Sequence, residues 1–544
     1  MRWHVCSCIG MVSWAISPLI GAEPGIPASD KPSPSISAAS SQTADHSVNI
    51  LVDQYIATSL REQRLRPSAR SSDMEYIRRV YLDIVGHIPP LEELESFLKS
   101  KDRNKRSTIV SQLMETDGYI HYWSDIWTNL LVGRDPPRAA SREHLTAWVS
   151  DSLSTGQSYD QFVYDLVSAT GEREENGAVN FLLSHLNDQA TPATAKISQL
   201  FLGMRLQCTQ CHDHPFNQWK QDQFWQLNAF FRQTRQTREG DNETLKVKLL
   251  NSDDPSPVYF ERRSGLMSVA FPTLFDGTLL EDFSDTNRRR ALALFLIKPE
   301  NRWLSEALVN RMWGHFFGYG FTHPMDDMGP HNPPTHPEVL RQLAVDFVQS
   351  NFDVKHLIRT ITSTESYHRS SVIYRGNERD NPASGSAPSF SRMYVKQMTA
   401  EQLYRSLIIA TQADQAGAKN NKDADARRDR WLKQFVVTFG TDENDETTTF
   451  DGTIPQALMM MNGDLMQKAV GIDPGSLLVQ ILQENTSDAE KIRRLYLVAL
   501  CRYPSLQELN GLKRVVSTTN SPRLIAFQDL FWALLNSNEF MLNH

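Results

Sequence analysis

The chain has 544 residues, of which 40% are hydrophobic and 22% charged, with 27 prolines and 26 glycines. This composition is that of an ordinary globular protein, and it excludes collagen-like, low-complexity and disulfide-dense chains. At about 150 residues per domain, the length predicts two or three domains, each with its own core. The 56 Lys and Arg residues against 64 Asp and Glu residues give a net charge of −8. No excess of basic charge attracts phosphates, so a nucleic-acid partner is disfavoured.

The N-terminus is typical of a secreted protein. Arg2 precedes an apolar run from Val5 to Ile20, and the small pair Gly21-Ala22 suits cleavage by signal peptidase. We therefore predict a signal peptide over residues 1–22, a periplasmic, secreted or cell-surface location, and no transmembrane helix in the mature chain. The alternative is an irregular N-terminal helix of a cytosolic protein. Residues 23–48 are rich in Pro, Ser and Ala and predict a disordered linker.

Apolar residues at helical spacing follow from Asn49 onward. Ser72 to Glu75 reads as a capping box ahead of one helix, and Pro89-Pro90 ends that helix. Trp123 and Trp127 lie one helical turn apart, and we interpret them as core rather than as the wall of a cofactor site. Residues 49–236 are predicted to form one helical domain, with further helices over 91–98, 109–114, 120–131, 145–153 and 162–167.

Helical periodicity fails over residues 237–275, where short β-prone runs predict a connector. Helical patterns return after it, so residues 276–544 are predicted as a second helical domain. Within this domain, residues 414–430 are charged and poor in apolar groups and predict a solvated loop or a partly ordered insertion. The predicted fold class is therefore mainly α, with two helical domains joined by a short β-containing irregular segment.

The sharpest motif is Cys208-Thr209-Gln210-Cys211-His212. In this C-x-x-C-H spacing, two thiols can form thioethers with the vinyl groups of haem while the histidine ligates the iron. Composition alone would produce such a string in about one of a thousand chains of this kind. We therefore predict that Cys208, Cys211 and His212 bind haem c.

The same residues permit two other interpretations. Cys208, Cys211, His212 and His214 offer two thiolates and two imidazoles for zinc or iron, although the spacing crowds a closed ligand shell. Alternatively, the two cysteines form a disulfide. Asp213 either accepts the second N–H of an imidazole or caps a helix or turn. Aromatic residues that either line a flat cofactor or belong to the core follow the motif: Phe216, Trp219, Phe224, Trp225, Phe230 and Phe231.

A second polar cluster lies in the C-terminal half. Arg311 and His315 fall one turn apart on one face of a predicted helix, and Gly318 permits a sharp exit that could fold Asp326 back toward them. Such a pocket would suit an anionic or hydroxyl-rich ligand or acid–base chemistry. The alternative is a buried Arg–Asp pair that locks the loop, with Thr335 to Glu338 as a capping box. The pocket residues are Asn310, Arg311, His315, Asp326, Asp327 and His336.

These motifs resemble a family of exported planctomycete proteins that pair a cytochrome-related domain of unknown function (domain of unknown function 1549) with a planctomycete-specific one (domain of unknown function 1553). The resemblance implies export and a cytochrome-like site, but the biochemistry of the family is not established. Some members carry an additional N-terminal cytochrome c domain, whereas no C-x-x-C-H occurs here before Cys208. The residues that carry the resemblance are Arg78 to Asp83, Gly86, Pro89, Gly203 to Phe231, Asn310 to Gly320, Asp326-Asp327, His336-Pro337, Ser366 to Arg369, Pro455 to Leu458 and Asn536 to Phe540.

Taken together, the sequence predicts an exported haem- or metal-binding protein with a redox or electron-transfer role in the cell envelope. A redox partner protein or a carbohydrate-like substrate would then meet the iron centre, as in a haem-dependent oxidoreductase component. The alternative is a non-redox envelope binding or scaffold protein stabilised by zinc or a disulfide. A hydrolase that uses His315 and Asp326 is a third hypothesis, and it lacks a recognisable nucleophile motif.

Overall fold

The computed structural model describes residues 38–240, 246–280, 287–439, 453–518 and 523–544. The predicted signal peptide and most of the predicted linker lie outside these residues. The structure consists of one unit up to Ala44 and a second, compact unit from Asp45 to His544, which carries all contacts discussed below. None of the described helices combines the length and the apolarity that crossing a bilayer requires.

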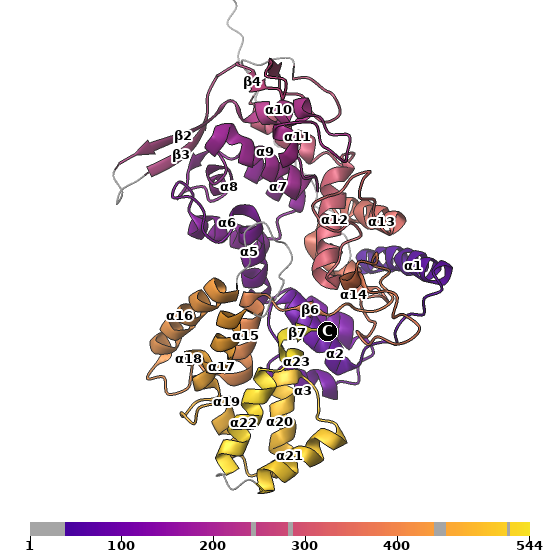
Figure 1. Cartoon of the computed structure of the whole chain (residues 1–544), viewed down its shortest axis with the longest axis vertical. Helices are drawn as coiled ribbons and strands as arrows, with labels where there is room; N and C mark the ends of the chain where they lie inside the picture. Colours follow the sequence, from indigo (N-terminus) through magenta and orange to yellow (C-terminus); the bar gives the residue numbers. More distant parts are fainter. Residues whose placement is uncertain (1–37, 241–245, 281–286, 440–452, 519–522) are drawn as a thin grey trace, which may run out of the picture. The chain divides into compact units, whose positions relative to one another are not determined.

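The first part of the chain is helical, as predicted (Figure 1). Ser72 is the N-cap of α2, and its hydroxyl accepts a hydrogen bond from the Glu75 amide at 3.1 Å, which confirms the predicted helix start. Helix α1 begins at Ala38, inside the stretch predicted as linker, because this part of that stretch is rich in Ala and Ser and has no proline. The bounds are α1 Ala38–Glu62, α2 Asp73–Ile84, α3 Leu91–Lys99, α4 Lys105–Leu113, α5 Asp117–Val132, α6 Arg142–Ser154, α7 Tyr159–Ser168, α8 Val179–Leu183, α9 Asn187–Phe201, η1 Gln207–Gln210, α10 Gln221–Asn228 and η2 Ala229–Phe231.

The connector forms short antiparallel strands where β-prone runs were predicted. Strands β2 (Thr234–Glu239) and β3 (Lys246–Asn251) pair with each other, and β1 (Gly171–Glu172) joins the free edge of β3. Strands β4 (Val258–Glu261) and β5 (Met267–Ala270) form a separate hairpin. The mainly α class with a short strand-containing segment between two helical parts is therefore confirmed.

The remainder of the chain is again helical. The stretch predicted as a solvated loop over 414–430 is helical from Asn421 onward. Ion pairs within one turn, including Arg427 with Asp423, support this helix, and Trp431 and Phe435 bury its C-terminal half. The bounds are α11 Arg288–Leu296, α12 Arg302–Phe317, α13 Pro337–Gln349, α14 Val354–Ser363, η3 Pro382–Ser384, β6 Lys396–Gln397, α15 Ala400–Thr411, α16 Asn421–Phe439, α17 Ile454–Asn462, α18 Asp464–Ala469, α19 Leu477–Gln483, α20 Asp488–Leu500, α21 Leu506–Thr518, α22 Arg523–Leu535, α23 Asn538–Met541 and β7 Leu542–Asn543.

A continuous hydrophobic core runs from α1 to α23. Trp123 and Trp127 of α5 belong to it, which confirms their interpretation as core residues. Helix α12 is buried on nearly all sides, and its Trp313 stacks on Phe317 with ring centroids 4.3 Å apart. Both predicted domains therefore contribute to one packed interior.

The carboxylate of Asp83 in α2 is buried, with 1% of the residue exposed, and connects α2 to distant parts of the chain. Its Oδ1 accepts from Lys396 Nζ and from Asn543 Nδ2, both at 2.7 Å. Its Oδ2 accepts from the Tyr367 hydroxyl at 2.8 Å. The Lys396 ammonium also donates to the carbonyls at the end of α12, so this one cluster holds both predicted domains together.

Two neighbouring arginines of α2 also connect this helix to the second predicted domain. Arg78 donates to the carbonyl of Phe540 at 2.7 Å and to that of Ala499 at 3.1 Å, which satisfies the C-terminal groups of α20 and α23. Arg79 donates to the carbonyl of Tyr367 at 2.5 Å. The side chains of Arg78 and Asp83 therefore have partners in the last third of the chain, and so does Arg79 in addition to its ion pair with Glu75 in α2.

We expect Asp83→Asn to lower the free energy of unfolding by about 3–5 kcal/mol, because it leaves the Lys396 ammonium buried without its counter-charge. Glu338→Gln is the matched control: it removes an exposed ion pair with Arg341 and should cost about 0–1 kcal/mol. Urea unfolding followed by circular dichroism measures both values. Equal costs for the two variants would contradict the structural role given to Asp83.

Candidate functional site

The C-x-x-C turn is fixed from beneath by buried residues. Cys208 lies in the short helix η1, and Cys211 follows its last residue. Thr209 is fully buried and donates from its hydroxyl to the carbonyl of Leu206 at 2.6 Å. The carbonyl of Gln210 accepts from Trp225 Nε1 at 3.1 Å. The turn is thus anchored to α10, while both cysteine thiols are free and exposed.

Asp213 caps α10 with its side chain. Its Oδ1 accepts from the amide of Gln221, the first residue of α10, and its Oδ2 from Lys220 Nζ, both at 3.0 Å. These hydrogen bonds lower the pKa of Asp213. The cap interpretation of Asp213 is confirmed, and the carboxylate is not the group that orients His212.

His212 is oriented by a backbone carbonyl. Its Nδ1 lies 2.7 Å from the carbonyl oxygen of Asp213. A carbonyl can only accept, so Nδ1 carries the proton and Nε2 keeps its lone pair. Histidines that ligate metals are typically fixed in this way by a hydrogen bond from the nitrogen that is not bound to the metal. In the neutral ring of the exposed His212, Nε2 is therefore the nitrogen that keeps a lone pair.

His214 has the opposite arrangement. Its Nδ1 accepts hydrogen bonds from the backbone amides of Phe216 and Asn217, both at 3.2 Å. In the neutral ring the proton therefore lies on Nε2, which donates and has no lone pair to offer a metal. Partial burial lowers the pKa of His214, which favours the neutral ring. The two histidines of the motif are thus held in different tautomers.

The aromatic residues after the motif are mostly core. Five of the six are buried, and Trp225 stacks on Phe260 with ring centroids 5.5 Å apart. Phe216 is the exception, with 79% of the residue exposed and its ring centroid 6.4 Å from that of His214. Of this set, only Phe216 presents a free aromatic face beside the motif.

The residues of the predicted second-domain pocket contact several different neighbours. Asn310 is fully buried and ties the loop after α12, because its amide donates to the carbonyls of Thr322 and Met325. Arg311 donates to the carbonyl of Leu200 in α9 at 2.9 Å. His315 Nε2 lies 2.9 Å from the carbonyl of Asp83. Arg311 and His315 therefore face different neighbours despite their one-turn spacing.

The acidic residues of this cluster also have partners of their own. Asp326 is fully buried and accepts from Gln199 and from Arg205 Nε, the latter at 2.8 Å. An Arg–Asp pair thus fixes this loop, but the arginine is Arg205, whose side chain is 45% exposed, so the predicted pair is buried only at its carboxylate. Asp327 lies 3.1 Å from His331 Nε2.

The predicted capping box at Thr335 is wrong. His336, not Thr335, is the N-cap of α13, it makes no side-chain cap, and Pro337 occupies the first helical position. Glu338 pairs with Arg341 instead of reaching back to the cap. His336 is buried, with Nδ1 3.0 Å from the hydroxyl of Thr335.

The loop after α12 packs against the residues that lead into the C-x-x-C turn. The amide of Met328 donates to the carbonyl of Gly203 at 2.8 Å. Gly203 has a φ of +66°, and a Cβ there would lie 2.7 Å from the Met328 sulfur, so a side chain at this position would be strained and would displace Met328. The ring of His331 lies 5.8 Å from that of His214. The approach of His331 to the motif and the pairing of Arg205 with Asp326 have no local signal in the sequence, because each joins positions more than a hundred residues apart.

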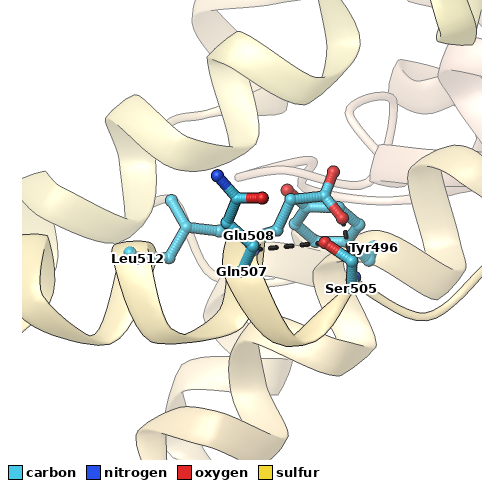
Figure 2. A pocket seen from close by; sticks show the side chains of 6 residues that line it. Tyr496, Ser505, Gln507, Glu508 and Leu512 are labelled. Atoms are coloured by element: carbon cyan, nitrogen blue, oxygen red, sulfur yellow. Dashed lines mark hydrogen bonds between the residues drawn. The ribbon is translucent and has the colours of Figure 1, made fainter.

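Among the described residues, no group of three or more His, Cys, Asp or Glu side chains converges in a way that could hold a metal ion. A hollow of about 380 Å³ lies beside α21 (Figure 2). Two of its polar groups form a capping box: Glu508 accepts from the amide of Ser505 at 2.6 Å, and the Ser505 hydroxyl accepts from the amide of Glu508 at 3.2 Å. Arg502 holds the same carboxylate and lowers the pKa of Glu508 to about 2. This hollow therefore belongs to helix capping.

Two family models match the chain, both described as a protein of unknown function: DUF1549 over residues 51–236 and DUF1553 over residues 288–516. The chain belongs to the proteins that pair these two domains. The resemblance inferred from the motifs is confirmed. The C-x-x-C-H motif and the Asp83 carboxylate lie in the DUF1549 domain, and α12 with its loop lies in the DUF1553 domain. No curated protein and no solved structure matches the chain.

Because of its buried histidines, we expect the folded protein to lose stability in acid. Burial lowers the pKa of His336 to about 4, whereas an unfolded histidine titrates near 6.5. Between these values the unfolded chain binds a proton that the folded chain does not, so stability is complete above about pH 6.5 and falls as the pH drops to 4. We expect His336→Gln to reduce the slope of unfolding free energy against pH in this window by about 1.4 kcal/mol per pH unit. Urea unfolding at a series of pH values measures it, and an unchanged slope would be inconsistent with a neutral buried His336.

Proposed function

We propose that Cys208, Cys211 and His212 bind haem covalently, and that the protein has a redox or electron-transfer role in the cell envelope. The observation that carries this proposal is the built turn: both thiols and the His212 imidazole are exposed on a hydrogen-bonded frame. The His212 tautomer leaves Nε2 available for iron. A bound haem would supply one-electron chemistry at that iron.

The donor set fits haem better than zinc. In a c-type site each thiol adds across a vinyl group at the porphyrin edge, so the two sulfurs need not point at the metal. A closed zinc shell instead needs four ligands around one point. His214 cannot supply the fourth through Nε2 while its Nδ1 accepts two amide hydrogen bonds. These features favour three residues around a porphyrin over four around zinc.

The surroundings support an electron-transfer role over a sealed catalytic centre. Phe216 is exposed next to the motif and provides an apolar face against which a porphyrin could pack. The thiols lie at the surface, so a cofactor held there would be accessible to a partner protein. The predicted signal peptide agrees, because covalent haem attachment takes place outside the cytoplasmic membrane.

The second candidate is a non-redox scaffold stabilised by zinc or a disulfide. It is favoured by the place of the motif, where the loop of the DUF1553 domain packs on the residues preceding the C-x-x-C turn. A staple at this point would stiffen the contact between the domains.

We expect Cys211→Ser to abolish covalent pigment. The protein is produced with an exported leader in a host that matures c-type cytochromes, and pigment is assessed by the Soret band and by a haem mass that survives denaturation. Cys501→Ser is the matched control: this buried thiol lies against Arg78, far from the motif in sequence, and its loss should leave the pigment intact. A colourless, folded wild-type protein with one bound zinc would contradict the proposal and favour the scaffold.

The tautomers predict different spectra for two neighbouring variants. His212→Ala should retain covalent haem but shift the Soret band, because the axial imidazole is lost. His214→Ala should leave the Soret position unchanged, because its ring presents an N–H where a ligand needs a lone pair. Absorption spectra of the oxidised and reduced proteins measure both effects. A spectral shift in His214→Ala alone would show that the ligand assignment is wrong.

A further inference from the structure

A run of exposed apolar side chains lies in the irregular segment between α14 and η3. Val372, Ile373 and Tyr374 follow one another in the chain, and their exposed fractions are 63%, 55% and 40%. Apolar residues scattered singly over a surface need no explanation, whereas contiguous ones mark a contact site for a protein or a membrane. The loop therefore presents an apolar surface, and its neighbours indicate what contacts it.

Hydrogen bonds fix this loop against the chain that follows α1. Asn377 is fully buried, and its Oδ1 accepts from the amide of Tyr374 at 3.0 Å. Its Nδ2 donates to the hydroxyl of Ser68 at 2.7 Å, and that hydroxyl donates to the carbonyl of Val372 at 2.8 Å. The polar groups of the turn are thus bonded within the protein, and the apolar side chains project from an ordered frame.

The chain that follows α1 brings arginines to the same surface. The amide of Arg66 donates to the carbonyl of Gly376 at 3.0 Å, and Arg379 donates to the carbonyl of Gln63 at 3.2 Å. Five arginines here oppose two glutamates, although the whole chain has a net charge of −8. None of the five forms an ion pair with a residue that the structure describes. The charged residues are Arg61, Arg64, Arg66, Arg375 and Arg379 against Glu62 and Glu378.

From these contacts we propose that residues 61–66 and 372–379, the arginine–apolar patch, bind the surface of a phospholipid membrane that contains anionic lipids. The apolar side chains enter the boundary between headgroups and acyl chains, and the guanidinium groups donate to lipid phosphates. Tyr374 suits this boundary, because its hydroxyl donates to the carbonyls of Arg66 and Pro67 while part of its ring stays exposed.

The combination of charge and apolar surface favours lipid over a soluble polyanion. A nucleic acid or an acidic polysaccharide would engage the arginines but would leave Val372 and Ile373 in water. A lipid surface accommodates both groups, because its phosphates and its hydrocarbon lie within about 5–10 Å of each other. The association is peripheral and does not depend on the C-x-x-C-H site.

The test is flotation of the protein, without its predicted signal peptide, on lipid vesicles. One set is phosphatidylcholine alone, and the other contains about a third phosphatidylglycerol. Dextran sulfate is the soluble polyanion. Ile373→Ser removes an apolar side chain of the patch, and Leu506→Ser on α21 removes an equally exposed one elsewhere. Arg375→Gln removes a charge of the patch, and Lys101→Gln, between α3 and α4, is its control. Circular dichroism verifies that each variant is folded.

We expect the wild type to bind the phosphatidylglycerol vesicles, and the binding should weaken as salt is raised. Ile373→Ser should weaken it about tenfold. Arg375→Gln should weaken it about fivefold, which corresponds to about 1 kcal/mol for one basic residue near an anionic surface. Each control should change it less than about twofold.

Three results would overturn the proposal: no binding to the phosphatidylglycerol vesicles, equal binding to phosphatidylcholine alone, or unchanged binding in both Ile373→Ser and Arg375→Gln. Tighter binding to dextran sulfate than to the vesicles would also overturn it, because the arginines would then serve an anionic polymer. The assay needs no haem, so its result is separate from that of the pigment experiments.

Discussion

The buried carboxylate of Asp83 is the contact on which the arrangement of the two domains depends. It accepts from Lys396, Tyr367 and Asn543, which all follow the start of the DUF1553 match. A buried charge without such partners costs several kcal/mol, so neither domain could keep these residues as they are if the other were absent. Arg78 extends the dependence to the last helices. The pairing of the two family models in one chain therefore has a physical reason.

Contacts between the two domains also position the candidate site. Asp326 is buried against Arg205, and Met328 bonds to Gly203, so the loop of the DUF1553 domain packs against the approach to the C-x-x-C turn. Beneath the turn, Thr209 and Trp225 satisfy the backbone. The turn is thus hydrogen-bonded to residues beneath it, while its two cysteines are exposed. Such a division suits a cofactor that is added after folding, because no packed side chain has to move to admit it.

Local patterns predicted most of the fold and only part of the site. The capping signal at Ser72 and the β-prone connector are contained in a few adjacent residues, and both agree with the structure. The sequence pattern did not predict helix α16, because ion pairs stabilise its first half and these give no hydrophobic periodicity. The pocket around Arg311 was inferred from one helical face, but α12 is buried on nearly all sides, so each residue meets a different neighbour. Those neighbours lie far away in the chain and leave no local signal.

The tautomers of His212 and His214 show why residue type and spacing alone left haem and zinc open. Both residues are histidines within one motif, and by spacing each is a candidate ligand. What separates them is the backbone: a carbonyl of Asp213 accepts from one ring, and the amides of Phe216 and Asn217 donate to the other. When a backbone carbonyl accepts from Nδ1, the proton lies on Nδ1 and Nε2 keeps its lone pair. When backbone amides donate to Nδ1, the proton of the neutral ring lies on Nε2. The proposal of haem rather than zinc therefore rests on the path of the chain just after Cys211, where a few peptide groups decide which imidazole keeps a lone pair on Nε2.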